Sequence, residues 1–126
     1  MTVRPLSVLV IDDDMDVLAS VRLLLCPSGW TVTTTGNARH GLKLASTVQP
    51  DVIVCDAVMP ELSGPELIEA LKREPMTRGT PIVLMTAYSA EMFADVPWHQ
   101  FLAKPFDTAQ LHGAIEGAAA RAGQLG

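Results

Sequence analysis

Short apolar runs alternate along the chain with segments whose apolar residues repeat at helical spacing. Five of these runs have the length and the β-branched or apolar composition of strands. They span residues 6–11, 30–35, 52–55, 82–85 and 100–103. The run at 52–55 is apolar without interruption, which predicts a central strand that is buried on both faces.

Four segments repeat apolar residues every three or four positions, which indicates helices with one buried side. Residues suited to cap a helix stand where these segments begin: Asn37, Ser63 with Glu66 at capping-box spacing, and Asp107 with Gln110. The connection at 87–99 has the weakest pattern. Its Ser89 can cap a turn or two of helix before Pro97 ends it, so we expect a shortened helix there.

Strands that alternate with helices predict an α/β fold, with a doubly wound five-stranded parallel sheet and helices on both faces. A chain of 126 residues is large enough for one hydrophobic core. We therefore expect a single domain over residues 1–126, in which about 120–126 form a tail or the start of a linker.

Polar residues stand at the ends of four of the predicted strands. Asp12 and Asp13 follow the first strand, Asp56 the third, Thr86 the fourth and Lys104 the fifth. Each has a simpler interpretation when taken alone, as a helix cap, a turn residue or a solvated lysine. The carboxyl ends of parallel strands lie along one edge of a sheet, so their joint occurrence predicts a site there.

The chemistry of these residues favours a cation and phosphoryl transfer. Two carboxylates ~4 Å apart repel each other by roughly 4 kcal/mol at an effective dielectric of about 20. All-oxygen ligands suit a hard ion, and a site with few protein ligands suits Mg²⁺. Asp56 can act as a nucleophile toward a phosphoryl group, with the Lys104 ammonium and the Thr86 hydroxyl on the phosphoryl oxygens.

Composition narrows the class of partner. The net charge of −5 and the absence of a basic run argue against a nucleic-acid surface. Cys26 and Cys55 are too far apart for a CxxC motif, and we expect both to be core thiols in a reducing compartment. No signal-peptide pattern opens the chain and the first apolar run is too short to span a membrane, so we expect a soluble, cytoplasmic protein.

The set of strand-end residues resembles the receiver domain of two-component response regulators. The motifs that carry the resemblance are Asp12-Asp13, Asp56 followed by Met59-Pro60 and Gly64, Thr86-Ala87, and Lys104-Pro105-Phe106. They extend over almost the whole chain. The resemblance implies a flavodoxin-like sheet with the strand order 2-1-3-4-5.

The resemblance also assigns roles to residues. Asp56 is expected to be the phosphoacceptor, and Asp12, Asp13 and Asp56 to hold Mg²⁺ with the backbone carbonyl of Val58. Thr86 is expected to be the switching hydroxyl and Lys104 the phosphoryl-contacting lysine.

Phe101 is the aromatic residue expected to turn inward on activation. The donor would be a phosphohistidine on a sensor histidine kinase or a phosphotransfer protein, and the downstream protein or output domain is not identified. No organic cofactor is implied.

Two departures from the family pattern bear on function. The stretch between Thr86 and Lys104 is several residues shorter than usual, which leaves the mode of dimerisation open and makes Trp98 either a contact residue or a core aromatic. Val58 and Tyr88 border the expected path of the hydrolytic water. Their apolar and aromatic side chains predict slow self-dephosphorylation.

Two other classes of protein remain as alternatives. A pseudo-receiver would bind partners on the same fold without phosphorylation, although such domains usually lack part of the acid, threonine and lysine set. A haloacid-dehalogenase-type phosphatase could be imitated by Asp12 and Asp14. That enzyme needs a second acidic pair beyond its lysine, and only Asp107 follows Lys104 before the last helix, so we expect no enzyme.

Overall fold

A five-stranded parallel sheet forms the centre of the protein in a computed structural model that describes residues 5–121. The strands run in the order β2-β1-β3-β4-β5, and each neighbouring pair is parallel. They are β1 (Ser7–Ile11), β2 (Thr31–Thr35), β3 (Val52–Asp56), β4 (Ile82–Thr86) and β5 (Gln100–Ala103). This topology confirms the predicted fold class and strand order.

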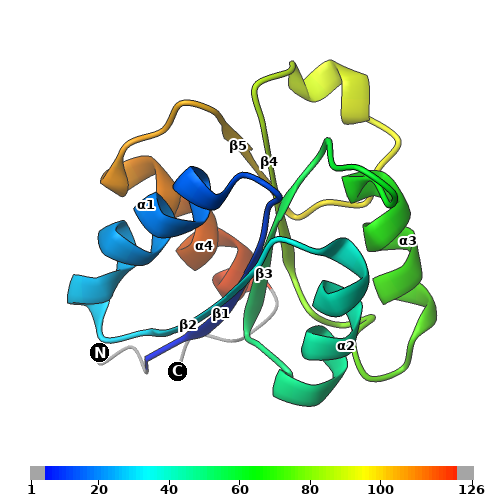
Figure 1. Ribbon diagram of the computed structural model, residues 1–126, viewed down its shortest axis with the longest axis horizontal. Coiled ribbons are helices and arrows are strands. Elements are labelled where there is room, and N and C mark those ends of the chain that lie inside the picture. Colours follow the sequence, from blue (N-terminus) through cyan, green and yellow to red (C-terminus); the bar gives the residue numbers. More distant parts are fainter. Residues whose placement is uncertain (1–4, 122–126) are drawn as a thin grey trace.

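Four helices cover the two faces of the sheet. They are α1 (Met15–Leu25), α2 (Ala38–Val48), α3 (Gly64–Arg73) and α4 (Thr108–Arg121). Figure 1 shows α1 and α4 on one side of the sheet and α2 and α3 on the other. Because α4 continues to Arg121, the expected tail begins inside this helix, and residues 122–126 lie outside the described part of the chain.

The predicted caps hold the starts of three helices. The Asn37 side chain accepts the His40 amide at 2.9 Å, and Ser63 and Glu66 form a reciprocal capping box. Asp107 and Gln110 likewise exchange hydrogen bonds between side chain and backbone, at 2.8 and 2.9 Å. Each bond satisfies an amide that has no partner within its own helix.

The connection between β4 and β5 contains a four-residue 3-10 helix, η2 (Ala90–Phe93), which confirms the expected shortened helix. The predicted cap is wrong, because Ser89 precedes η2 but its side chain makes no capping hydrogen bond. The Trp98 indole Nε1–H donates to the Phe93 carbonyl at 2.9 Å, and its ring lies 5.6 Å from that of Phe101. Trp98 is half-buried. Of the two interpretations of this tryptophan, the structure favours the core aromatic.

Side chains alternate along each strand and build two separate cores. Val10 and Val54 pack on the side of α1 and α4, while Ile11 and Cys55 pack on the side of α2 and α3. Cys55 is buried as expected, but the prediction for Cys26 is wrong. It lies exposed in the short 3-10 helix η1 (Cys26–Ser28), where the chain turns away from the core after α1.

Among the described residues, no helix combines the length and the apolar composition that crossing a bilayer would require.

Candidate functional site

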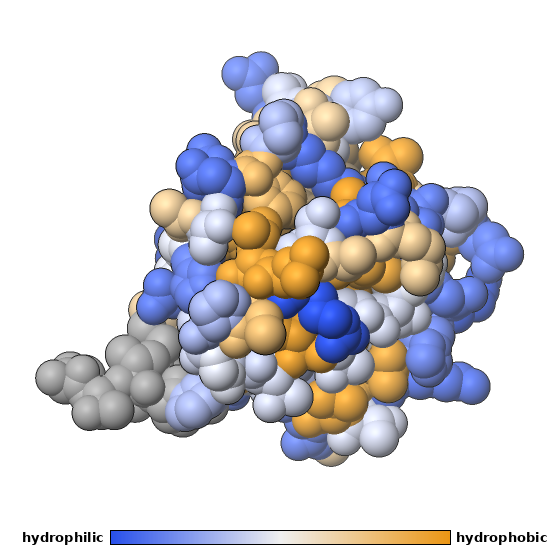
Figure 2. Space-filling model, turned by 60° about the vertical axis from the view of Figure 1, so that its left-hand side comes forward, coloured by the Kyte–Doolittle hydropathy of each residue, from blue (hydrophilic) through white to orange (hydrophobic). Residues whose placement is uncertain are grey.

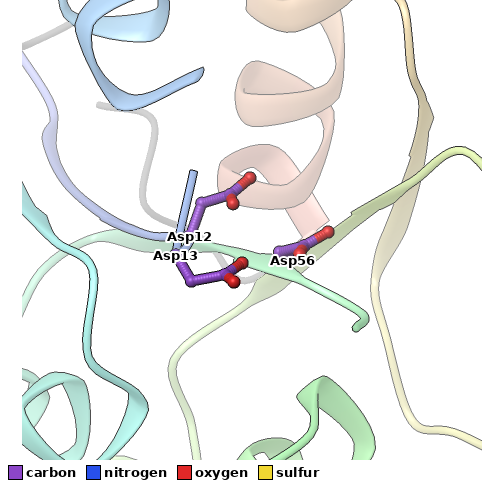
Figure 3. A group of neighbouring side chains, drawn as sticks. All are labelled: Asp12, Asp13 and Asp56. Atoms are coloured by element: carbon purple, nitrogen blue, oxygen red, sulfur yellow. The ribbon is translucent and has the colours of Figure 1, made fainter. Parts of the chain in front are cut away.

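Three carboxylates meet at the carboxyl edge of the sheet. Asp12 follows β1 and Asp56 ends β3, and these two strands are direct neighbours. Asp12, Asp13 and Asp56 each offer an oxygen atom, and these atoms all lie within 4.8 Å of one another (Figure 3). Asp12 is fully buried and Asp56 nearly so, whereas Asp13 is exposed, so the cluster opens to solvent on one side.

The third acid of the run, Asp14, has a different task. Its side chain accepts the amides of Asp16 at 2.9 Å and Val17 at 3.4 Å, which makes it the N-cap of α1. The Asp14 amide in turn donates to Asp12 Oδ1 at 2.9 Å and fixes that carboxylate. Capping of α1 therefore falls to Asp14, and Asp12 and Asp13 are left to face Asp56.

Lys104 is the cation of the cluster. Its Nζ atom lies 2.9 Å from Asp12 Oδ2 and 3.2 Å from Asp56 Oδ1. Burial favours the neutral amine, but the hydrogen bond to Asp12 and the charges of both carboxylates outweigh it and raise the pKa of Lys104. Lys104 is therefore charged at neutral pH. The sequence placed it at this edge but did not indicate that it bridges two acids.

The electrostatic balance leaves the site short of positive charge. Burial and the neighbouring Asp12 raise the pKa of Asp56, and the Lys104 ammonium opposes this shift without cancelling it. Three carboxylates converge here, and the ion pairs within the described residues join the Lys104 ammonium to two of them, Asp12 and Asp56. All the converging ligand atoms are carboxylate oxygens, so the donor set fits a hard divalent cation.

Thr86 lies at the end of β4 with its side chain buried. Its Oγ1 atom accepts the Tyr88 amide at 3.1 Å, and its carbonyl accepts the Lys104 amide at 2.9 Å. Following the alternation of β4, Thr86 continues the row of Ile82 and Leu84 on the side of α2 and α3.

Phe101 is not part of the carboxylate cluster. It pairs in register with Leu84, so its side chain faces the same side of the sheet as Leu84. Leu84 comes two residues before Thr86, so Phe101 lies further from the carboxyl edge than Thr86 does. It is half-buried against the core of that side. The structure therefore brings Asp12, Asp13, Asp56 and Lys104 together. Thr86 ends β4 one residue past Met85, the register partner of Asp56, whereas Phe101 packs on the side of α2 and α3.

Two exposed side chains follow the strand ends. The exposed fractions of Val58 and Tyr88 are 54% and 53%, at positions two residues beyond Asp56 and Thr86. The Val58 side chain is directed to solvent, two residues after Asp56. The role of the Val58 carbonyl as a metal ligand stays a prediction.

Gly64 shapes the loop that carries the chain from β3 into α3. Its amide donates to the Ala57 carbonyl at 3.0 Å. A Cβ atom at this position would lie 2.5 Å from the Asp56 carbonyl oxygen and 2.7 Å from the Ala57 Cα atom. The sequence indicated Gly64 only as part of the motif that follows Asp56, and its close approach to the backbone of Asp56 depends on the tertiary structure.

The three histidines have structural partners. His40 Nδ1 lies 3.1 Å from Thr35 Oγ1, and His99 Nδ1 accepts the Ile82 amide at 3.0 Å. The His112 ring stacks on Trp30 with 4.6 Å between centroids. None of them belongs to the carboxylate cluster.

An apolar groove of about 380 Å³ begins beside Lys104 and runs between α1 and the loop that precedes α4. Its apolar walls are Val17, Leu24, Ala87, Pro105 and Phe106. Figure 2 is turned so that the side of α1 and α4 in Figure 1 comes forward, and it shows an apolar patch near the middle of that view. The site thus has an open, partly apolar approach from the side of α1.

Comparison with known proteins places this site in a family. Residues 8–116 match the family model of the response regulator receiver domain. A 14.6 kDa protein of Leptolyngbya boryana is 32% identical over 114 residues, which are 87% of each chain. The transcriptional regulatory protein PrrA of Mycobacterium tuberculosis is 36% identical over 124 residues, covering 92% of this chain and 51% of PrrA.

The solved structures agree. The chemotaxis response regulator CheY4 of Vibrio cholerae is 28% identical with a TM-score of 0.83, covering 90% of this chain and 98% of that one. The chain belongs to the response regulator receiver family. Proteins of this family are signalling domains that generally bind Mg²⁺ at an acidic pocket and interact with histidine kinases and downstream effectors.

Proposed function

We propose that this chain is a working phosphoacceptor, in which Asp56 receives a phosphoryl group from a phosphohistidine. The donor is a sensor histidine kinase or a phosphotransfer protein. The observation that carries the proposal is the position of Asp56, whose nearly buried carboxylate lies beside Asp12 and Asp13 and within 3.2 Å of the Lys104 ammonium.

In the proposed reaction, an Asp56 carboxylate oxygen attacks phosphorus while the bond from phosphorus to the donor imidazole nitrogen breaks. The imidazole leaves with the bonding electron pair, and Asp56 becomes an acyl phosphate. Lys104 Nζ is already within 3.2 Å of Asp56 Oδ1, so a modest movement of its flexible side chain would bring it to a phosphoryl oxygen. The chain's own contribution is to position the carboxylate and to neutralise charge.

Asp12, Asp13 and Asp56 would hold Mg²⁺, with the carbonyl of Val58 as a further ligand. The bound ion would neutralise charge on the phosphoryl oxygens. The fit rests on the excess of carboxylates over ammonium groups in the cluster and on its all-oxygen donor set. Asp13, the exposed member, would take up the ion from the solvent side.

Thr86 and Phe101 would form the switch. The buried Thr86 hydroxyl is a donor that can turn toward a new anion at Asp56, because in the present state it only accepts the Tyr88 amide at 3.1 Å. Phe101 lies on the same face of the sheet and is half-buried, so it can fill space that Thr86 vacates. Phosphorylation would then shift the balance between two packings of this face.

The proposed role is that of a signalling domain over residues 1–126, with at most slow self-dephosphorylation and no turnover of external substrates. A location in the cytoplasm stays a prediction. The downstream partner is a protein or an output domain, which the site chemistry does not identify.

The test is intact mass spectrometry after incubation with acetyl phosphate and Mg²⁺. We expect a single phosphoryl adduct on the wild-type chain. The Asp56→Asn variant and a wild-type sample with EDTA should show none. Asp95→Asn, an exposed acid in the connection between β4 and β5, is the matched control and should be modified like the wild type.

Three other outcomes would contradict the proposal in different ways. The absence of an adduct on the wild type would contradict phosphorylation and favour a pseudo-receiver. An adduct that survives Asp56→Asn would place the acceptor elsewhere. Multiple turnover of a phosphomonoester would favour the phosphatase.

A further inference from the structure

The outer strand β2 presents main-chain hydrogen-bonding groups that its neighbour β1 does not use. The Thr31 amide donates to the Leu6 carbonyl at 2.9 Å, and the Thr35 carbonyl accepts the Asp12 amide at 3.1 Å. Residues of a parallel strand direct their main-chain groups alternately to one side and the other. The amides and carbonyls of Val32 and Thr34 therefore point away from the sheet.

Arg22 of α1 reaches across this outer edge. Its Nη1 donates to the Val32 carbonyl at 3.2 Å, and its Nη2 donates to Thr34 Oγ1 at 2.9 Å. Of these two bonds one reaches a main-chain carbonyl of the outer side of β2 and the other a side-chain hydroxyl. A guanidinium is suited to this task because its planar fork binds two acceptors at once.

Without Arg22 the edge has the properties of a strand that pairs with another chain. All six residues of the segment 30–35 are β-branched or aromatic, and none is charged or proline. Natural sheets usually protect such an edge with a charge, a proline or a bulge. In this protein β2 has neither a charged residue nor a proline, and the charge at the edge comes from Arg22 of the neighbouring helix α1.

The edge is also complementary to itself. Consider an antiparallel arrangement in which the twofold axis passes between the Thr33 residues of the two copies. Val32 of each copy would then pair with Thr34 of the other copy. Both residues point outward, so each pair could exchange two main-chain hydrogen bonds. The same arrangement would bring the two Arg22 guanidinium groups close to the axis, where their like charges repel.

From this geometry we propose that Arg22 is an edge guard, which keeps β2 from pairing with β2 of a second copy of this chain. It does so by occupying the Val32 carbonyl and by placing a positive charge at the point where the twofold axis would pass. The pairing partner is the chain itself, and the inference does not depend on phosphorylation of Asp56.

The first experiment compares the molar mass of wild type and Arg22→Ala by size-exclusion chromatography with light scattering, at matched high concentration. We expect Arg22→Ala to approach twice the molar mass of the wild type, in a concentration-dependent manner. Arg22→Lys keeps the charge but not the planar fork, so its shift should be smaller. The control Arg39→Ala removes an exposed arginine from α2 and should behave as the wild type.

A second variant identifies the surface. Val32→Pro removes an outward amide that β1 does not use and obstructs strand addition. Combined with Arg22→Ala, it should restore the wild-type mass. Hydrogen exchange should slow at the Val32 and Thr34 amides of Arg22→Ala, and exchange at the Thr34 amide should stay fast in the double variant, which has no amide hydrogen at position 32.

Three results would overturn the proposal. One is an Arg22→Ala chain that folds and keeps the wild-type mass. Another is a larger species that persists in the double variant, because it would use a different surface. The third is exchange at Val32 and Thr34 that is equally fast in wild type and Arg22→Ala. Because Arg22→Ala could also lose stability, Arg22→Gln is measured in parallel and must show the same direction of change.

Discussion

Asp12 and Asp14 have the same side chain and stand two residues apart, yet the structure gives them different tasks. Asp14 accepts two amides at the start of α1, and Asp12 is buried against Lys104 and Asp56. The sequence left capping and metal binding open for this run because both need acids directly after a strand. Only the direction of each side chain decides between them, and that direction is set by the tertiary structure.

Val58 and Tyr88 carry a prediction about the lifetime of the phosphorylated state. Both side chains are more than half exposed and follow the ends of the strands that deliver Asp56 and Thr86. Positioned there, they would limit the approach of water to an acyl phosphate. We expect Val58→Asn and Tyr88→Ala each to shorten the lifetime by about tenfold, which corresponds to about 1.4 kcal/mol of barrier.

The measurement is the decay of the phosphoryl adduct by intact mass after removal of acetyl phosphate. Met92→Ala is a suitable control, since it removes an exposed apolar side chain from η2 rather than from a strand end. Unchanged lifetimes in both Val58→Asn and Tyr88→Ala would contradict the shielding role.

Among the elements, the strands and their ends were the most predictable part of the structure. Each of the five apolar runs became a strand, with bounds that differ by at most one residue, because continuous apolar segments of this length have few other places in a small α/β domain. The carboxyl ends of β1, β3 and β5, which carry Asp12, Asp56 and Lys104, lie close together, because parallel strands share one carboxyl edge. The ion pair from Lys104 to Asp12 was not predictable, because it depends on how far the loop after β5 bends over the sheet.

The junction of β3 and α3 depends on Gly64. We expect Gly64→Ala to lower the free energy of unfolding by about 2 kcal/mol or more, because the new Cβ atom would meet the backbone at 2.5 Å from the Asp56 carbonyl oxygen. The substitution should also displace Asp56 and slow the formation of its phosphoryl adduct with acetyl phosphate. Urea unfolding measures the first effect and the rate of adduct formation the second.

Gly79→Ala provides the matched control, because a Cβ atom at Gly79 would meet nothing within 4 Å. Its effect on stability should stay within about 0.5 kcal/mol, as for ordinary surface changes. Equal effects of the two substitutions would show that the close approach at Gly64 has no energetic weight.

At the scale of the whole molecule, the acid cluster costs stability. The native pKa of Asp56 is raised above 3.8 by burial and by Asp12, so the native state holds this proton more readily than the unfolded chain. The contribution of protonated Asp56 to the stability of the native state is fully present below the pKa that Asp56 has in the unfolded chain. It is lost as the pH rises through the native pKa of Asp56. At neutral pH the ionised Asp56 therefore lowers the free energy of unfolding.

We accordingly expect Asp56→Asn to be more stable than the wild type by about 1 kcal/mol at neutral pH in EDTA. The difference should shrink as pH falls from the native pKa of Asp56 toward the unfolded value, and it should also shrink when Mg²⁺ binds the wild type. Urea unfolding at several pH values, with and without Mg²⁺, measures both trends. A variant that is less stable than the wild type at neutral pH would contradict the argument.

The sheet also separates two groups of residues. Asp12 and Asp56 continue the rows of side chains that face α1 and α4, whereas Phe101 packs on the face of α2 and α3. The apolar groove beside Lys104 lies with the first group. If the proposed phosphoryl donor approached along this groove, it would lie on the other side of the sheet from Phe101. Phosphorylation at Asp56 would then reach Phe101 through the strands of the sheet and not through the surface that the donor covers.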